Sequence, residues 1–296
     1  MSETSKTPSH IQARPLRADF LPDETLAEGR LALLSELSQA AREITLPLFE
    51  NGANRATQNK AKGTDYDPVT AADIEAERVL RGIISNHFPD DAIEGEEFPD
   101  VDGTSDWSWT LDPIDGTRGF VAGIPVWSTL IAISFKGDPV IGLIDHPALG
   151  QSFFGVIKIS PSIAWRQLDC GAVSRLSTQS CAAISDAILG CTEPLSMLDH
   201  GELAAYNIIR HGAKFSRLGL DAYGYAMVAS GRMDVIIEAG LKPCDVRALM
   251  PVIEGAGGRL TNWHGGSAAG GGRAVAVGDA GLLPELYTYL GRAMSV

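Results

Sequence analysis

The strongest constraint on the fold is a short apolar segment that ends in two carboxylates. Residues 109–117 read Trp-Thr-Leu-Asp-Pro-Ile-Asp-Gly-Thr, so a strand-forming run is followed by Asp112 and Asp115 three positions apart. Pro113 stiffens the link between the two acids, and Gly116 with Thr117 begins a helix or a tight turn. Burying two carboxylates at a strand end is costly unless a cation or hydrogen-bond donors accompany them. The segment therefore predicts either a binding site or a sharp turn.

The residue types in this segment favour one kind of ligand. Carboxylate oxygens are hard ligands that suit Mg²⁺, and an ion held in this way keeps water and substrate oxygens in its shell. Backbone N–H groups at the start of a helix bind phosphate. The segment can thus supply both parts of a site for a metal ion and a phosphate group. The alternative is an Asp–Pro turn in which an Asp caps the following helix.

The hydrophobic pattern predicts helices followed by a run of strands in the first half of the chain. One helix begins near Thr25 and is limited by Pro47, and a second runs from Thr70 to His87. The expected strands lie at residues 91–93, 108–111, 128–135, 140–144 and 152–156. This order favours an α+β arrangement, here with an antiparallel sheet.

Strands and helices alternate in the second half, which favours an α/β unit with a mixed sheet. The expected strands lie at residues 187–191, 214–217 and 235–238, and the expected helices at 197–211, 221–230 and 245–255. Residues 265–272 are expected to form a hairpin or a flexible loop. We therefore expect a flexible arm at residues 1–22, an α+β domain at 23–160 and an α/β domain at 161–296.

The charge of the chain excludes two classes of partner. The chain has 296 residues and a formal net charge of −13, which repels nucleic-acid backbones and anionic membranes. A protein this acidic needs local positive charge to bind a phosphorylated molecule. The N-terminal residues do not have the pattern of a signal peptide, and no apolar run is long enough to span a bilayer. Four cysteines without a CxxC pair favour reduced thiols and a cytoplasmic location.

Further acidic residues extend the pattern, although each has a simpler explanation when taken alone. Glu96 and Glu97 follow an expected strand, where a pair of acids is costly unless it is solvated or bound to a metal. Asp73 lies in the first turn of an expected helix, where an acidic side chain is stabilising in any case. Asp245 likewise begins a helix. These acids gain meaning from their order along the chain.

In that order, the motifs resemble those of the inositol monophosphatase superfamily of metal-dependent, lithium-sensitive phosphatases. Residues 67–73 are similar to an early D-x-V-T-x-x-D motif, residues 95–97 to G-E-E, and residues 112–117 to D-P-I-D-G-T. Asp245 matches the acid of a C-terminal W-D motif, with Cys244 in place of the tryptophan. The resemblance covers the chain from about residue 25, and it implies a sandwich of alternating α and β layers.

The resemblance implies a set of metal ligands. One Mg²⁺ would be held by Glu96, Asp112 and the backbone carbonyl of Ile114, and a second by Asp112, Asp115 and Asp245. The resemblance also implies two or three Mg²⁺ ions in each site, for which Mn²⁺ could substitute. It further implies that the chain forms a homodimer.

Roles in catalysis and phosphate binding also follow from the resemblance. Asp73 and Thr117, assisted by Glu96, would orient or deprotonate the attacking water. The backbone of Gly116 and Thr117 would bind the phosphate, and Lys62 would close over the site.

Below the family level, the sequence is most similar to the histidinol-phosphatase branch. Residues 120–125, 229–232, 238–243 and 254–258 carry this similarity. L-Histidinol phosphate has an ammonium group and an imidazole, with which Asp221 and Glu238 would form charge-assisted hydrogen bonds. Alternatively, Asp221 only caps the helix that follows it.

Three other functions are weighed against this one. In the first, the substrate is inositol phosphate or a related sugar phosphate. In the second, the chain is a regulator that binds metal or phosphate without catalysis. Every metal-ligand position is filled, which argues against the regulator. An enzyme that forms an aspartyl phosphate would need D-x-D-x-T or D-x-D-x-V, a spacing that Asp112 and Asp115 lack.

Overall fold

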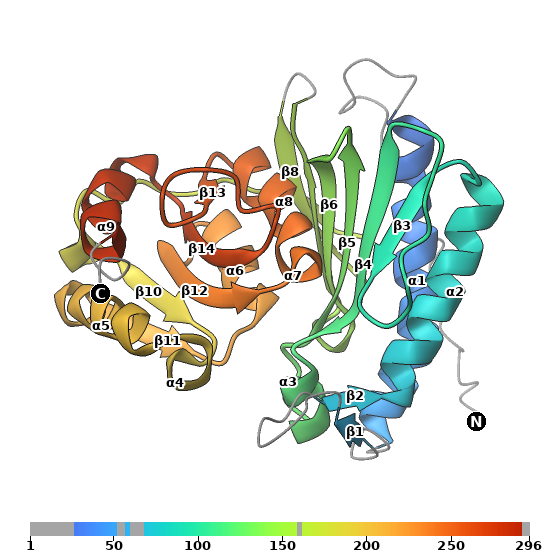
Figure 1. Ribbon diagram of the computed structural model, residues 1–296, viewed down its shortest axis with the longest axis horizontal. Coiled ribbons are helices and arrows are strands. Elements are labelled where there is room, and N and C mark those ends of the chain that lie inside the picture. The colour runs from blue at the N-terminus through green and yellow to red at the C-terminus, as the bar shows by residue number, and fades with distance from the viewer. Residues whose placement is uncertain (1–26, 52–56, 60–67, 159–161, 292–296) are drawn as a thin grey trace, which may run out of the picture.

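The computed structural model describes residues 27–51, 57–59, 68–158 and 162–291, and two large sheets with helices between and outside them make up most of this part of the chain (Figure 1). Helices α1 (Glu28–Glu50) and α2 (Ala71–His87) cover the outer face of the larger sheet. Helices α6 (Ala222–Ala229), α7 (Pro243–Arg247) and α8 (Leu249–Gly255) lie between the sheets. Helices α5 (His200–Gly212) and α9 (Leu283–Leu290) cover the far face of the smaller sheet. The predicted sandwich of alternating α and β layers is confirmed.

The larger sheet has seven strands in chain order, and β3 pairs with β4 in parallel while the other neighbours are antiparallel. Its strands are β3 (Ala92–Gly95), β4 (Trp107–Asp115), β5 (Ser128–Phe135), β6 (Asp138–His146), β7 (Gln151–Val156), β8 (Ile163–Leu168) and β9 (Val173–Arg175). The predicted antiparallel character of this half is confirmed. Strands β8 and β9 were not expected, and they continue the sheet beyond residue 160.

The smaller sheet has the order β11-β10-β12-β14-β13, with parallel pairs around β10 and antiparallel pairs around β14. Its strands are β10 (Ile188–Cys191), β11 (Phe215–Leu218), β12 (Val235–Leu241), β13 (Arg259–Thr261) and β14 (Gly272–Val277). The mixed sheet expected for the second half is confirmed. Residues 265–271 lie in the connection of the β13–β14 hairpin, and Gly272 begins β14, so the predicted hairpin is confirmed.

The remaining elements are short. They are β1 (Thr57–Asn59), β2 (Pro68–Thr70), α3 (Thr117–Ala122), α4 (Pro194–Met197), and the 3-10 helices η3 (Pro147–Leu149), η4 (Ile184–Asp186) and η5 (Ala280–Leu282). Within the described ranges, no helix combines the length and the apolar character needed to cross a membrane.

Alternation of side chains along the strands separates the cores. On β5, Ile131 and Ile133 face α1 and α2, whereas Leu130 and Ala132 face the central helices. On β14, Ala274 and Ala276 contact the central helices, while Val275 and Val277 contact α5 and α9. Strands buried on both faces are expected to read as continuous apolar runs. This explains why β5 could be predicted from its sequence at residues 128–135.

Helix α1 corrects one prediction, because it continues through Pro47 to Glu50. A proline removes one helical hydrogen bond, but here it lies in the last turn, and the N–H of Asn51 still donates to the Pro47 carbonyl at 3.0 Å. Phe49 packs against Phe120 and Trp127, with ring centroids 5.5 Å away in both cases. Tertiary packing thus holds the turn that local propensity disfavours.

Two predicted helices differ from the structure in their bounds. The expected helix at 197–211 corresponds to α5, which begins at His200 because Asp199 and Glu202 form a reciprocal capping box there. The expected helix at 245–255 begins earlier, at Pro243, and is divided at Ala248 into α7 and α8. Pro251 has no N–H to donate to the carbonyl four residues earlier, which is consistent with the division.

Candidate metal and phosphate site

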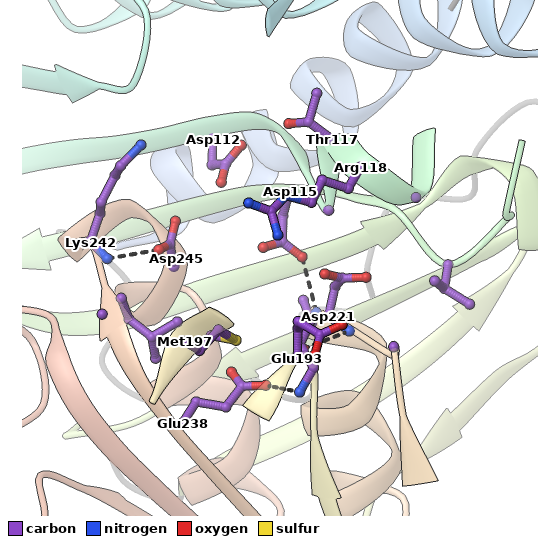
Figure 2. Close-up of a pocket in the computed structure, with 18 of the residues that line it drawn as sticks. Asp112, Asp115, Thr117, Arg118, Glu193, Met197, Asp221, Glu238, Lys242 and Asp245 are labelled. Carbon is purple, nitrogen blue, oxygen red and sulfur yellow. Dashed lines mark hydrogen bonds between the residues drawn. The ribbon is translucent and has the colours of Figure 1, made fainter. Parts of the chain in front are cut away.

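Carboxylates from β4 and α7 meet at the junction of the two sheets. Asp112, Asp115 and Asp245 each offer a ligand atom, and these atoms lie within 4.8 Å of one another. A second group, formed by Glu96, Asp112 and Cys244, meets the same limit. In Figure 2 the carboxylates of Asp112, Asp115 and Asp245 face a common space. The acidic residues that the sequence predicted as metal ligands are therefore brought together from distant parts of the chain.

An irregularity in β4 brings its two acids to the same side. The pairing with β5 shifts between Asp112, which is opposite Leu130, and Asp115, which is opposite Ser128. Three residues along β4 therefore correspond to two residues along β5. In a regular strand, residues three apart point to opposite faces, and one extra residue restores the same face. The strand also runs to Asp115 rather than ending near Leu111 as predicted. Thr129 Oγ1 donates to the Pro113 carbonyl at 2.8 Å and supports the irregular segment.

Hydrogen bonds from the backbone fix the two β4 carboxylates. The N–H of Ile114 donates to Asp112 Oδ1 at 3.1 Å. Asp115 Oδ2 accepts the N–H of Ala222 at 2.9 Å, at the start of α6, and the hydroxyl of Ser128 at 3.3 Å. Each carboxylate is thus held by the strand or by an adjoining element.

Asp245 is positioned by the first turn of α7. Its Oδ2 accepts the backbone N–H of Lys242 at 2.7 Å, and the Cys244 thiol lies 3.5 Å from Oδ1. Cys244 is buried, as expected for a small core residue. Its sulfur nevertheless belongs to the ligand cluster, which the sequence did not predict.

Burial and mutual repulsion make these carboxylates difficult to ionise without a cation. Burial raises the pKa of Asp112 well above its usual value, and Glu96, Asp115 and Asp245 raise it further. Burial also raises the pKa of Asp115, with added repulsion from Asp221 and Asp245. Burial likewise raises the pKa of Asp245. The carboxylate oxygens of this group fit Mg²⁺ or Mn²⁺, which would remove the repulsion.

Lys242 and Arg118 are the basic side chains among the described residues that line the surrounding cavity, whose volume is about 560 Å³. Lys242 Nζ lies 2.8 Å from Glu96 Oε1. Arg118 Nη1 lies 3.5 Å from the hydroxyl of Ser196 on the opposite wall. The sequence predicted Lys242 in a segment that lines the pocket, but it did not predict Arg118 as part of the site. For Arg118 the available signal was its position directly after Gly116 and Thr117.

Asp73 and Thr117 each have a structural partner. Asp73 Oδ2 accepts the N–H and the hydroxyl of Thr70, at 2.8 and 2.5 Å, as the capping box of α2. Burial raises the pKa of Asp73 to about 6, and Glu96 adds to the rise. Thr117 Oγ1 donates to the carbonyl of Ile114 at 3.0 Å. The first-turn explanation for Asp73 is therefore confirmed, and its part in orienting water stays a prediction.

Gly116 adopts a backbone conformation that suits glycine, with a φ of 77° directly before α3. A Cβ atom at this position would lie 3.0 Å from the carboxylate carbon of Asp221. The backbone that is expected to bind phosphate thus lies beside the acid that is expected to recognise the rest of the substrate.

Asp221 is held in a strained conformation, with φ 47° and ψ −142°. Such values are rare for residues with a side chain and occur mainly at functional sites. Its side chain forms no capping hydrogen bond with α6, so the capping alternative is wrong. Burial raises the pKa of Asp221 to about 6, while the nearby Arg118 opposes the rise.

Glu238 is buried on β12 and uses both of its oxygens. Oε1 accepts the N–H of Thr192 and Oε2 accepts the hydroxyl of Tyr225, each at 2.8 Å. Burial raises the pKa of Glu238 to about 7, although both hydrogen bonds lower it. Thr192 also accepts the N–H of Asp221 at 3.1 Å, which links the two acids. Lys62, and Asp67 of the first motif, lie outside the described residues.

Comparison with known proteins identifies relatives along most of the chain. The profile of the Inositol monophosphatase family matches residues 28–293. The bifunctional phosphatase IMPL2, chloroplastic, from Arabidopsis thaliana is 40% identical over 267 residues, which cover 90% of this chain and 72% of that protein. A histidinol-phosphatase from Streptomyces coelicolor is 32% identical over 276 residues, covering 92% of this chain and 98% of the relative.

A solved structure has a similar fold. An inositol monophosphatase from Zymomonas mobilis superposes with a TM-score of 0.70 at 30% identity. The match covers 90% of this chain and 100% of that chain.

Proposed function

The chain belongs to the inositol monophosphatase family and is a phosphatase, and we propose that it hydrolyses L-histidinol phosphate to L-histidinol in a Mg²⁺-dependent reaction. The placement of Asp221 carries the choice of substrate. Its half-buried carboxylate adjoins Gly116, on a backbone whose strain is offset by the surrounding fold. A cationic group close to the phosphate ester of a bound substrate would meet this carboxylate.

We assign the metal ligands as the family resemblance implies. Glu96, Asp112, Asp115, Asp245 and the Ile114 carbonyl would hold Mg²⁺, which supplies positive charge that polarises water and the phosphoryl oxygens. The N–H groups of Gly116 and Thr117 would bind phosphate. Thr117, with Asp73 and Glu96, would orient the attacking water and take its proton.

The acidic wall of the cavity supports a cationic substrate. Beyond the metal ligands, Glu193, Asp221 and Glu238 line the cavity, and Arg118 is the basic side chain near Asp221. Because both oxygens of Glu238 are already bonded, we assign Glu238 to holding Thr192 and Tyr225 and to adding negative charge. Asp221 would contact the ammonium or imidazole group directly. An inositol phosphate would gain less from this wall, because a neutral polyol forms no ion pair.

The first test is a phosphate-release panel with Mg²⁺ on histidinol phosphate, inositol 1-phosphate, fructose 1,6-bisphosphate and 3′-phosphoadenosine 5′-phosphate. We expect kcat/KM to be highest for histidinol phosphate. Turnover of inositol 1-phosphate alone would transfer the assignment to the alternative substrate. Absence of turnover on every phosphate ester would instead favour a non-catalytic regulator.

Asp221→Ala separates recognition of the cation from binding of the phosphate. A hydrogen bond to a charged group contributes about 1.5–3 kcal/mol, so kcat/KM for histidinol phosphate should fall at least about tenfold. The value for inositol 1-phosphate should change much less. Asp100→Ala is the matched control, because it removes an exposed acid that does not line the cavity. Equal losses on both substrates would show that Asp221 does not recognise the cation.

The homodimer, the cytoplasmic location and inhibition by Li⁺ stay predictions. Light scattering on purified protein tests the first of these, and phosphate release in LiCl, compared with NaCl, tests the third.

A further inference from the structure

The guanidinium group of Arg247 connects three segments next to the carboxylate cluster. Nη1 donates to Glu94 Oε2 at 2.6 Å and to Thr110 Oγ1 at 3.0 Å. Nε donates to the carbonyl of Ala269 at 3.0 Å, in the connection between β13 and β14. The Arg247 side chain is 17% exposed and that of Glu94 34%, so the ion pair is largely shielded from water. One side chain therefore joins β3, β4 and α7 with the smaller sheet.

The contacts of Arg247 follow the spacing of the expected metal ligands. Arg247 lies two residues after Asp245, and Thr110 lies two residues before Asp112. Residues two apart on a strand share a face, so Thr110 and Asp112 both point toward α7. Asp112 therefore faces Asp245, and Thr110 faces Arg247, as two successive contacts between the same two elements.

The second contact also includes the segment that carries Glu96. Glu94 is the register partner of Thr110 in the parallel pair β3–β4, and it lies two residues before Glu96. The ion pair to Glu94 and the hydrogen bond to Thr110 thus reach both ligand-bearing strands at once. By comparison, Lys242 contacts Glu96 with a side chain that is 50% exposed, a weaker link.

We infer that Arg247 is a positioning residue for the metal centre. Its planar guanidinium fixes the segment of Asp245 against the segments of Glu96 and Asp112, and so sets the distances between ligands that come from both sheets. Groups that orient metal ligands from outside the coordination shell typically affect metal affinity or activity 10–100-fold when removed. The inference rests on the metal centre of the proposed function.

Calorimetric titration of Mg²⁺ into the metal-stripped full-length chain tests this role. Arg247→Met removes the charge and all three hydrogen bonds, and we expect the Kd for Mg²⁺ to rise about tenfold. Glu94→Gln should raise the Kd in the same direction by a smaller factor. Arg247→Lys keeps the charge but loses the planar geometry, and should lie between wild type and Arg247→Met. The activity of Arg247→Met should recover at high Mg²⁺ concentration.

Arg30→Met is the matched control, because Arg30 forms a similarly shielded ion pair with Asp91 at 2.7 Å, between α1 and the residue that precedes β3. It should lower the melting temperature but leave the Kd for Mg²⁺ within twofold of wild type. A folded Arg247→Met variant with an unchanged Kd would overturn the inference. If that variant does not fold, unchanged values for Arg247→Lys and Glu94→Gln would overturn it. A wild-type chain that binds no Mg²⁺ would remove the proposed metal centre and this role together.

Discussion

Asp112 is the carboxylate that both ligand clusters share, and burial and its acidic neighbours hold its pKa well above the usual value. Its backbone contact, from Ile114 to Oδ1, would remain in an asparagine, whereas the negative charge would be lost. The charge is therefore needed for metal binding and costs stability when metal is absent.

Asp112→Asn should accordingly separate activity from stability. We expect phosphate release to fall to the detection limit, because both metal positions lose a ligand. In EDTA the melting temperature should rise, because the neutral amide would no longer repel Glu96, Asp115 and Asp245. Asp100→Asn, which changes an exposed acid, is the control for both measurements. An active Asp112→Asn enzyme would contradict the two-metal assignment.

At the residue scale, the motifs predicted the carboxylates of the site but not their surroundings. Glu96, Asp112, Asp115 and Asp245 stand in recognisable local patterns, and the structure brings them together. The strain at Asp221 and the contacts of Arg247 depend on residues that are distant in the chain. No local pattern encodes such contacts, so the sequence could not predict them.

At the element scale, two glycines allow α8 to pack directly on the larger sheet. A Cβ at Gly142 of β6 would lie 2.1 Å from the Ala248 carbonyl oxygen, and one at Gly155 of β7 would lie 2.2 Å from the Pro251 carbonyl carbon. Both clashes involve backbone atoms, which cannot rotate away. Helix α8 continues the segment of Asp245, so this close packing also sets the position of the last metal ligand.

Gly155→Ala should therefore destabilise the protein, by roughly 1–3 kcal/mol as is usual for overpacking. Gly82→Ala is the matched control, because this glycine lies within α2 and a Cβ there would meet nothing within 4 Å. That control should stabilise the protein by about 0.5–1 kcal/mol. Urea unfolding of the two variants measures both changes. A Gly155→Ala variant with an unchanged free energy of unfolding would contradict the close packing of α8.

Elements were predictable where the local signal agreed with the tertiary environment. Helix α2 was predicted within one residue, because Thr70 and Asp73 form its capping box. The irregularity in β4 was not predicted, because it exists only relative to the register of β5. The last turn of α1 was also missed, since packing of Phe49 holds it against the effect of Pro47.

At the scale of the whole molecule, the acidic junction between the two sheets makes stability depend on pH. Burial raises the pKa of Asp73 and Asp221 to about 6, from 3.8, and that of Glu238 to about 7, from 4.5. Between about pH 4 and pH 7 these three groups therefore bind more protons in the folded chain than in the unfolded chain. Their contribution to the free energy of unfolding falls as the pH rises through this range. The net charge of −13 acts in the same direction through self-repulsion.

Mg²⁺ should reverse this dependence, because metal ligands bind in their deprotonated form. In EDTA we expect a higher melting temperature at pH 5.5 than at pH 8. At pH 8, Mg²⁺ at 100 times its Kd should stabilise the folded chain by about 2.7 kcal/mol, or roughly 5–10 °C. The gain should be smaller at pH 5.5, where protons compete for the carboxylates, and absent in Asp112→Asn. A metal-free protein whose melting temperature rises from pH 5.5 to pH 8 would show that the buried acids at this junction are not the groups that limit its stability.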